Sequence, residues 1–277
     1  MTTRLPTRRY RGGGRMAVTI LAIALVAACG GGSGAQTRTR ASAQTSPSAP
    51  AVPPTTAAAI AKPCLWAAES TRVFRFKTSD GATLVGVVLG TGRTGLVLGH
   101  QLGSDLCEWL PQARAFARRG YRVLVFDFAG FGDSQPGPDG RVDTDVVAAA
   151  AELRRRGADR IVLVGSSMGG TAVLAAATRI RPPVAGVVSL SGPSGFGGVD
   201  AEAAMARLRV PVLFVVGADD QPFREQARLL YRAARVRDKR LLVVPGGGHG
   251  TSLLEFGEDA PRLRAAVRRF VAEQTRH

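Results

Sequence analysis

Histidine and cysteine are scarce in this sequence, which has only three of each among 277 residues. The histidines are His100, His249 and His277, and together with the cysteines they show none of the clustering that metal ligands need. We therefore expect neither a metal ion nor an organic cofactor. Long apolar runs are also lacking. The run over residues 16–28 is shorter than the ~20 residues of an ordinary membrane-spanning helix, which excludes such a helix there.

Acidic residues are absent from the first 28 positions, which carry five arginines. These arginines account for five of the formal net charge of +16 and leave +11 on the rest of the chain. The remaining arginines are spread over several expected helices and do not form one stripe with interleaved aromatic residues. This pattern indicates a compositional bias, and we expect no nucleic-acid partner.

The beginning of the chain has the parts of a bacterial export signal. An arginine-rich segment over residues 1–15 precedes the apolar run, which ends Val26-Ala27-Ala28-Cys29. Small residues directly before a cysteine resemble a lipobox, in which that cysteine is acylated and becomes the mature N-terminus. Val26 departs from the leucine usual at its position. The alternative is a plain cleaved signal in which Cys29 is incidental.

We therefore predict a lipoprotein signal peptide over residues 1–28 and an exported protein held on the extracytoplasmic side of the membrane by lipid on Cys29. Residues 29–62 consist mainly of Gly, Ala, Ser, Thr, Pro and Gln. Such a segment buries too little apolar surface to offset its ordering entropy, so we predict a flexible tether. The folded domain is predicted over residues 63–277.

Two cysteines remain once Cys29 is assigned to lipid. Cys64 and Cys107 lie in the predicted domain, and an exported protein meets an oxidising environment in which a disulfide persists. We predict that they form a disulfide, which requires Cα atoms within about 7 Å of each other. The alternative is a pair of buried free thiols.

Short apolar runs alternate with amphipathic segments throughout the predicted domain. We expect strands over residues 73–77, 83–89, 94–98, 121–126, 161–164, 184–190, 212–216 and 240–244. We expect helices over residues 109–119, 143–156, 171–178, 200–208, 223–234 and 259–273. This alternation predicts a mostly parallel sheet with helices on both faces.

The chemistry is concentrated at Gly165-Ser166-Ser167-Met168-Gly169, a Gly-x-Ser-x-Gly sequence between an expected strand and an expected helix. A serine on such a turn is exposed as a nucleophile, and the following helix N-terminus favours developing negative charge. The pattern alone is weak, because a glycine-rich turn also produces it. Its context of strand, turn and helix favours Ser167 as a nucleophile.

A nucleophilic serine needs a base and an acid that orients the base. His249 follows the 240–244 strand and precedes the last helix. His100 instead precedes the Gly-x-Ser-x-Gly sequence, which we call the elbow, and His277 is the final residue. We therefore predict His249 as the base. The acid is expected after the 212–216 strand, where Asp219 and Asp220 are adjacent. We favour Asp220 and keep Asp219 as the alternative.

These motifs together resemble the α/β-hydrolase superfamily, in its esterase, lipase and serine-peptidase branch. The resemblance covers nearly all of residues 72–275. It includes the order Ser167, Asp220, His249 and the Gly-x-x-Asp sequence over residues 217–220, whose last residue is usually the acid in that family. The resemblance implies an α/β-hydrolase fold and an oxyanion hole formed by the backbone N–H groups of Leu102 and Met168. Gln101 departs from the glycine usual at its position.

Members of this superfamily often carry a large lid after the sixth strand, but residues 191–211 are few and glycine-rich here, so we expect a minimal lid. We predict a serine hydrolase that cleaves an acyl bond, a carboxylic ester in the first instance, in a small or lipid-like substrate. The alternatives are an acyltransferase acting on a cell-envelope acceptor and a catalytically silent surface binding protein. We expect a monomer.

Overall fold

A computed structural model describes residues 62–70 and 72–276 of the chain. The predicted signal peptide, Cys29 and almost all of the predicted tether lie outside these residues. The described residues belong to a unit that spans residues 56–277. Among them, no helix has the length and apolar composition needed to cross a membrane.

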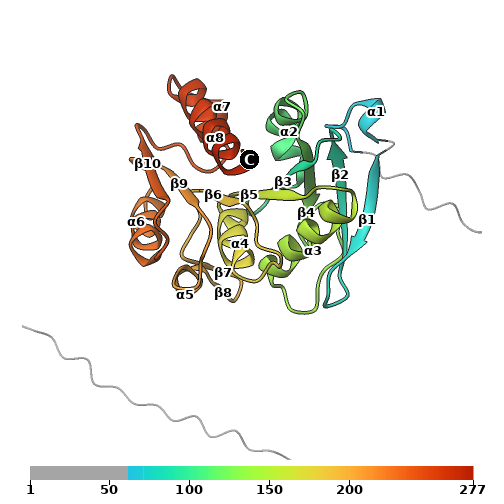
Figure 1. Cartoon of the computed structure of the whole chain (residues 1–277), viewed down its shortest axis with the longest axis horizontal. Helices are drawn as coiled ribbons and strands as arrows, with labels where there is room; N and C mark the ends of the chain where they lie inside the picture. Colours follow the sequence, from blue (N-terminus) through green and yellow to red (C-terminus); the bar gives the residue numbers. More distant parts are fainter. Residues whose placement is uncertain (1–61, 71, 277) are drawn as a thin grey trace, which may run out of the picture. The chain divides into compact units, whose positions relative to one another are not determined.

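The described unit is organised around one large sheet (Figure 1). Its strands are β1 (Val73–Lys77), β2 (Thr83–Leu89), β3 (Thr94–Gly99), β4 (Arg122–Asp127), β5 (Arg160–Ser166), β6 (Gly186–Leu190), β9 (Val212–Gly217) and β10 (Lys239–Val244). They lie in the order β1-β2-β4-β3-β5-β6-β9-β10. The strands from β4 to β10 pair in parallel, and β2 pairs antiparallel with both β1 and β4.

Helices cover both faces of the sheet. They are α1 (Ala67–Ser70), α2 (Leu110–Ala117), α3 (Val142–Arg155), α4 (Met168–Ala177), α5 (Ala201–Met205), α6 (Phe223–Ala233), α7 (Ser252–Glu255) and α8 (Ala260–Thr275), with a 3₁₀ turn η1 (Leu106–Trp109) before α2. Figure 1 shows α2 and α8 on one face and α3, α4 and α6 on the other. Each face has its own apolar core, one packed on α3 and α4 and the other on α2 and α8.

The central strand β5 is buried on both faces of the sheet. Its residues Ile161, Val162, Leu163 and Val164 are at most 1% exposed, because both faces of the strand are covered by helices. A strand covered on both faces is apolar without alternation, as parallel sheets require. The predicted α/β architecture is therefore confirmed.

The segment between β6 and β9 is short, as expected. It holds the two-stranded ribbon β7 (Gly195–Phe196) and β8 (Val199–Asp200), followed by α5. The side chain of Asp200 caps α5 by accepting a hydrogen bond from the backbone N–H of Ala203.

One local difference from the sequence prediction concerns α4, which begins at Met168 and not at residue 171. Gly169 and Gly170 fall in its first turn, and glycine has a low intrinsic preference for helix. Tertiary packing of this turn against neighbouring backbone outweighs that preference.

Candidate active site

The predicted site residues gather at the carboxyl edge of the sheet. Ser167 follows β5, Asp220 follows β9 and His249 follows β10, while Leu102 follows β3. β5, β6, β9 and β10 are successive neighbours in the sheet, so the loops after them share one edge. In open α/β sheets, ligands bind outside the carboxyl ends of the strands.

Ser167 occupies a strained turn between β5 and α4. Its φ is 48° and its ψ is −114°, a conformation that costs a non-glycine residue about 1–3 kcal/mol. The backbone fixes this turn on both sides: Ser167 donates its N–H to Leu190 O at 2.8 Å and accepts from Thr171 N at 3.1 Å. Ser167 is thereby held at the N-terminus of α4, as an elbow serine requires.

The two glycines of the motif allow backbone segments to approach closely. A Cβ atom on Gly165 would lie 2.1 Å from Gly169 O, so β5 and α4 could not pack as they do. A Cβ atom on Gly169 would lie 2.2 Å from O of Gly99, the last residue of β3, and 2.7 Å from O of His100, the residue that follows β3. The absence of a side chain at Gly169 thus allows the predicted oxyanion loop to pack against α4. This requirement for glycine could not be predicted from the sequence.

Asp220 and His249 form a direct pair. Nδ1 of His249 lies 3.0 Å from both carboxylate oxygens of Asp220, which is 7% exposed. With Nδ1–H donated to the carboxylate, Nε2 carries the lone pair that a general base needs. Asp219 is exposed and does not share this contact. The structure therefore pairs His249 with Asp220, the favoured candidate, and not with Asp219.

The loop that carries His249 is fixed by hydrogen bonds to hydroxyl groups. His249 N donates to Ser252 Oγ at 2.9 Å. Thr251 N donates at 3.1 Å to Oγ of Ser166, the residue directly before Ser167. The imidazole is also packed against the ring of Phe223, with ring centroids 4.3 Å apart. The loop after β10 and the elbow after β5 are thereby joined.

His100 has a different role from His249. It has no exposed surface, and burial lowers its pKa. Its Nδ1 lies 2.8 Å from Gln101 O and its Nε2 lies 3.1 Å from the backbone nitrogen of Phe128. Because Phe128 can only donate, Nε2 accepts and Nδ1–H donates to Gln101 O. Both ring nitrogens are used, so His100 holds the loop after β3 and offers no base.

The predicted oxyanion donors come from two adjoining segments. Met168 is the first residue of α4, where backbone N–H groups lack intrahelical acceptors. Leu102 lies in the turn after β3, and its side chain is 58% exposed beside the site. Gln101 N donates instead to Glu108 Oε2 at 2.9 Å. Gln101 replaces the usual glycine without competing for an oxyanion, and its Oε1 accepts from Ser166 Oγ at 3.2 Å.

Glu108 lies behind this loop, where Gln101 N donates to it, and no sequence motif pointed to it. Burial raises the pKa of its carboxyl group, whereas the hydrogen bond from Gln101 N and the nearby hydroxyl groups of Ser104, Ser166 and Thr251 act to lower it. The carboxyl group is therefore surrounded by the three segments that carry the predicted site: the loop after β3, the elbow and the loop after β10.

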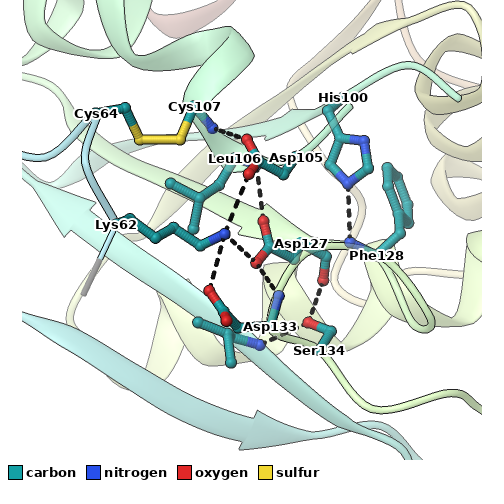
Figure 2. A network of polar contacts seen from close by, with 11 residues as sticks. Lys62, Cys64, His100, Asp105, Leu106, Cys107, Asp127, Phe128, Asp133 and Ser134 are labelled. Atoms are coloured by element: carbon teal, nitrogen blue, oxygen red, sulfur yellow. Dashed lines mark hydrogen bonds and ion pairs between the residues drawn. A yellow bond between two sulfur atoms is a disulfide. The ribbon is translucent and has the colours of Figure 1, made fainter. Parts of the chain in front are cut away.

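A buried ionic cluster anchors the first described residues to the same loop (Figure 2). Lys62 Nζ lies 2.9 Å from Asp127 Oδ2, 2.9 Å from Asp133 Oδ2 and 3.2 Å from Asp105 Oδ2. Burial alone would lower the pKa of Lys62, but its hydrogen bonds to Asp127 and Asp133 and the nearby negative charge outweigh burial and raise it. Lys62 was predicted as the last tether residue, and the structure places it inside the fold.

The predicted disulfide is present beside this cluster. Cys64 and Cys107 are bonded, with Cα atoms 5.8 Å apart, inside the expected limit. Asp105 connects the two features: it contacts Lys62 and its Oδ1 accepts from Cys107 N at 2.8 Å. We name residues 62–64 the N-terminal clasp, because an ion pair and a covalent bond both fasten this segment to the loop between β3 and α2.

Comparisons with known proteins agree with this architecture. A family model described as the alpha/beta hydrolase fold matches residues 94–208. A 2-hydroxy-6-oxononadienedioate/2-hydroxy-6-oxononatrienedioate hydrolase from Burkholderia vietnamiensis is 37% identical over 111 residues, 38% of each chain, and one from Paraburkholderia phymatum is 35% identical over the same length. The match thus spans well under half of these curated relatives.

Solved structures cover more of the chain at lower identity. A monoacylglycerol lipase from Paleococcus ferrophilus has a TM-score of 0.61 and 20% identity, covering 69% of this chain and 99% of the lipase. An esterase from Pyrococcus furiosus has a TM-score of 0.63 and 17% identity, covering 73% of this chain and 89% of the esterase. An esterase from a Rhodococcus species has a TM-score of 0.61 and 19% identity, covering 73% and 98%.

A mostly parallel sheet with an elbow serine after β5 and an acid–histidine pair after the last two strands defines an α/β-hydrolase fold. The family-model match over residues 94–208 agrees with this fold. The matched residues include Leu102 and Ser167, whereas Asp220 and His249 lie beyond them.

Proposed function

We propose that this protein is a serine hydrolase that cleaves a carboxylic ester through an acyl-enzyme intermediate. The observation that carries the proposal is the contact of His249 Nδ1 with both oxygens of Asp220, in a loop bonded to the residue before the strained Ser167. This arrangement supplies an oriented base on a loop that is bonded to the residue before a serine at a helix N-terminus.

In the proposed reaction, Ser167 Oγ attacks the acyl carbonyl carbon and His249 Nε2 takes the hydroxyl proton. The carboxylate of Asp220 holds the imidazole in the required tautomer and stabilises the imidazolium that forms. His249 then gives the proton to the leaving alcohol. Water, deprotonated by the same nitrogen, attacks the acyl-enzyme and releases the acid.

The oxyanion of each tetrahedral intermediate would be held by the backbone N–H groups of Leu102 and Met168. Removing one such donor in a serine hydrolase costs about 10²–10³ in kcat. The partly buried contacts of Gln101 and Glu108 support this role, because they fix the backbone on the N-terminal side of Leu102.

Covalent labelling tests the nucleophile directly. A fluorophosphonate probe should modify Ser167, as read by mass spectrometry of the labelled peptide, and Ser167→Ala and His249→Ala should abolish labelling and ester turnover. Turnover should be measured on p-nitrophenyl esters of increasing chain length, aminoacyl amides and a 2-hydroxy-6-oxo-dienoate. The proposal fails if Ser167→Ala keeps activity within about tenfold of the parent, because removing a nucleophilic serine lowers kcat by far more than tenfold.

The acid is tested by two neighbouring substitutions. Asp220→Asn should lower kcat by about 10⁴, because the amide favours the wrong imidazole tautomer. Asp219→Asn serves as the matched control, since its side chain is exposed and outside the pair. The reverse result would assign the acid to Asp219 and leave the rest of the mechanism standing.

The same residues could also transfer the acyl group to an alcohol acceptor of the cell envelope. Product analysis in water with and without added alcohol separates hydrolysis from transfer. A binding protein without catalysis would leave Ser167 unlabelled by the probe.

We further propose that the protein is exported and anchored through lipid on Cys29. A short apolar run followed by small residues and Cys29 supports this proposal. In a bacterium supplied with labelled palmitate, the parent should incorporate label and Cys29→Ser should not. Incorporation by Cys29→Ser would refute the lipobox interpretation.

A further inference from the structure

Among the described residues, two non-glycine residues adopt a positive φ: Ser167 at 48° and Ser191 at 50°. Such a conformation is strained for a residue with a Cβ atom and persists where the surroundings enforce it, often at functional sites. Glycine would adopt the same backbone without this strain. For Ser167 the proposed nucleophilic hydroxyl explains why glycine is not used. Ser191 needs an explanation of its own.

The backbone of Ser191 does not require a serine side chain. Ser191 directly follows β6, and its N–H donates to Val215 O on the neighbouring strand β9 at 2.8 Å. That bond continues the pairing between two parallel strands and would be available to any residue other than proline. The reason for serine at this position therefore lies in its hydroxyl group.

The hydroxyl of Ser191 bridges Asp220 and the loop that carries His249. Its Oγ–H donates to Asp220 Oδ2 at 2.7 Å, and its oxygen accepts from the N–H of Gly250 at 3.1 Å. Gly250 directly follows His249, whose Nδ1 contacts the same Asp220 carboxylate. Ser191 has no exposed surface, so water does not substitute for these bonds.

The carboxylate needs such a partner to keep its orientation. One side of the Asp220 carboxylate faces His249 Nδ1–H, and without a second donor the group could rotate about its Cβ–Cγ bond. The Ser191 hydroxyl fixes Oδ2 of Asp220 and, through the N–H of Gly250, also fixes the position of the loop that carries His249. A hydrogen bond to a charged group contributes about 1.5–3 kcal/mol, enough for a tenfold to hundredfold change in a population or rate.

We propose that Ser191 is a positioning residue for the hydrolytic site: its hydroxyl holds Asp220 and the His249 loop in their reactive arrangement, and the strained backbone at Ser191 is retained for that hydroxyl. This inference rests on the proposed serine hydrolase function. Ser191 contacts neither the substrate nor the reacting atoms in this role, and it acts through Asp220 and Gly250.

The test separates the strain at Ser191 from its hydroxyl group. Ser191→Gly loses the hydroxyl and the strain together, so its free energy of unfolding in urea should exceed that of Ser191→Ala, which loses the hydroxyl and keeps the strain. The kcat of Ser191→Gly should fall about tenfold to a hundredfold with KM within about threefold, since only the reacting groups are disturbed. Ser191→Ala keeps the strain and loses the hydroxyl, so it should show the same fall in kcat.

Two further measurements separate positioning from a general structural role. Ser194→Ala, in the same segment, is the matched control and should leave kcat within about twofold of the parent. In an Asp220→Asn background, Ser191→Gly should have almost no additional effect on the rate of fluorophosphonate labelling, because its hydroxyl acts through Asp220. Fully additive effects would contradict the proposal.

The outcomes for the two proposals are distinct. If the parent labels at Ser167 and Ser191→Gly keeps the parental kcat within about twofold, the role of Ser191 is refuted and the hydrolase stands. If Ser191→Gly loses activity only as its folded fraction falls, the residue is structural and the inference is again refuted. If the parent fails to label at Ser167, the hydrolase proposal fails and the inference about Ser191 fails with it.

Discussion

Nζ of Lys62 lies 2.9 Å from Oδ2 of Asp127, a carboxylate with no exposed surface at the end of β4. The remaining contacts of Asp127 are backbone N–H groups: Leu106 N donates to its Oδ1 at 2.7 Å and Asp133 N to its Oδ2 at 2.9 Å. Lys62 thus supplies the positive charge that compensates a fully buried carboxylate, and it does so from the first residue that the structure describes.

Removing this cation should be strongly destabilising. Lys62→Met leaves Asp127 buried and negatively charged, and breaking a buried ion pair from one side costs about 3–5 kcal/mol of unfolding free energy. Urea unfolding of the parent, of each single variant and of Lys62→Met with Asp127→Asn would measure the coupling. We expect the double variant to recover part of the loss. A loss below about 1 kcal/mol for Lys62→Met would contradict this account.

The disulfide should stabilise the fold and support activity. Cys64 and Cys107 close a loop with a sequence separation of 43 residues. For a loop of this length the chain-entropy model gives roughly 3–4 kcal/mol. Cys64→Ser with Cys107→Ser, or the reduced parent, should unfold at lower urea concentration and lower temperature. Activity should fall as well, because the bridge holds the segment next to Leu102. Equal midpoints for the oxidised and reduced protein would rule this out.

Asp145 should make stability depend on pH in an unusual direction. Burial and the nearby negative charges of Asp80 and Asp143 raise its pKa to about 7, although the bond from Ala129 N acts to lower it. The folded state therefore binds a proton that the unfolded chain, with a pKa near ~3.9, releases. For this group, the free energy of unfolding falls as pH rises from about 4 to about 7, and is constant above.

The matched variant for this prediction is Asp145→Asn, which keeps an oxygen acceptor for Ala129 N and removes the charge. It should be more stable than the parent at pH 8 by an amount on the order of a few kcal/mol, since one pKa unit corresponds to about 1.4 kcal/mol. The difference should shrink toward pH 4. Urea unfolding at a series of pH values measures it, and a difference that grows on acidification would show the sign to be wrong.

Gly169→Ala should impair both folding and turnover. Its Cβ atom would lie 2.2 Å from Gly99 O, a backbone atom that cannot rotate away, so the loop after β3 or the start of α4 must move. Leu102 follows in the same loop, and we expect kcat to fall by at least about tenfold. Gly137→Ala is the control, because its Cβ atom would make ordinary 3.4 Å contacts with Ala129 and Ala82. Parental kcat in Gly169→Ala would exclude a role for this packing.

Much of the fold could be predicted because it depends on local patterns. The runs that form β5 and β9 are apolar without interruption, and the elbow motif lies between a strand and a helix. Asp220 could be preferred over Asp219 because its Gly-x-x-Asp sequence resembles the α/β-hydrolase pattern, and the structure places Asp220 against His249.

The remaining parts of the site depend on side-chain contacts that no local pattern encodes. Lys62 is a single charged residue at the end of a low-complexity segment, and only folding brings it to Asp127. Glu108 has the spacing of an exposed helical residue, yet Gln101 N donates to it. Ser191 lies in a run rich in serine and glycine. Its contact with Asp220 joins the segments that follow two neighbouring strands, β6 and β9.

The clasp also determines how the domain can be handled experimentally. The first described residue, Lys62, lies beside the carboxyl ends of β3 and β4. Helix α8 ends near the opposite edge of the sheet, where Gln274 O accepts a hydrogen bond from the Arg160 side chain at the start of β5. An affinity handle placed after α8 therefore points away from the reacting groups. A truncated chain starting at Pro63 would keep the disulfide but lose the ammonium group that neutralises Asp127, so truncation should stop before Lys62.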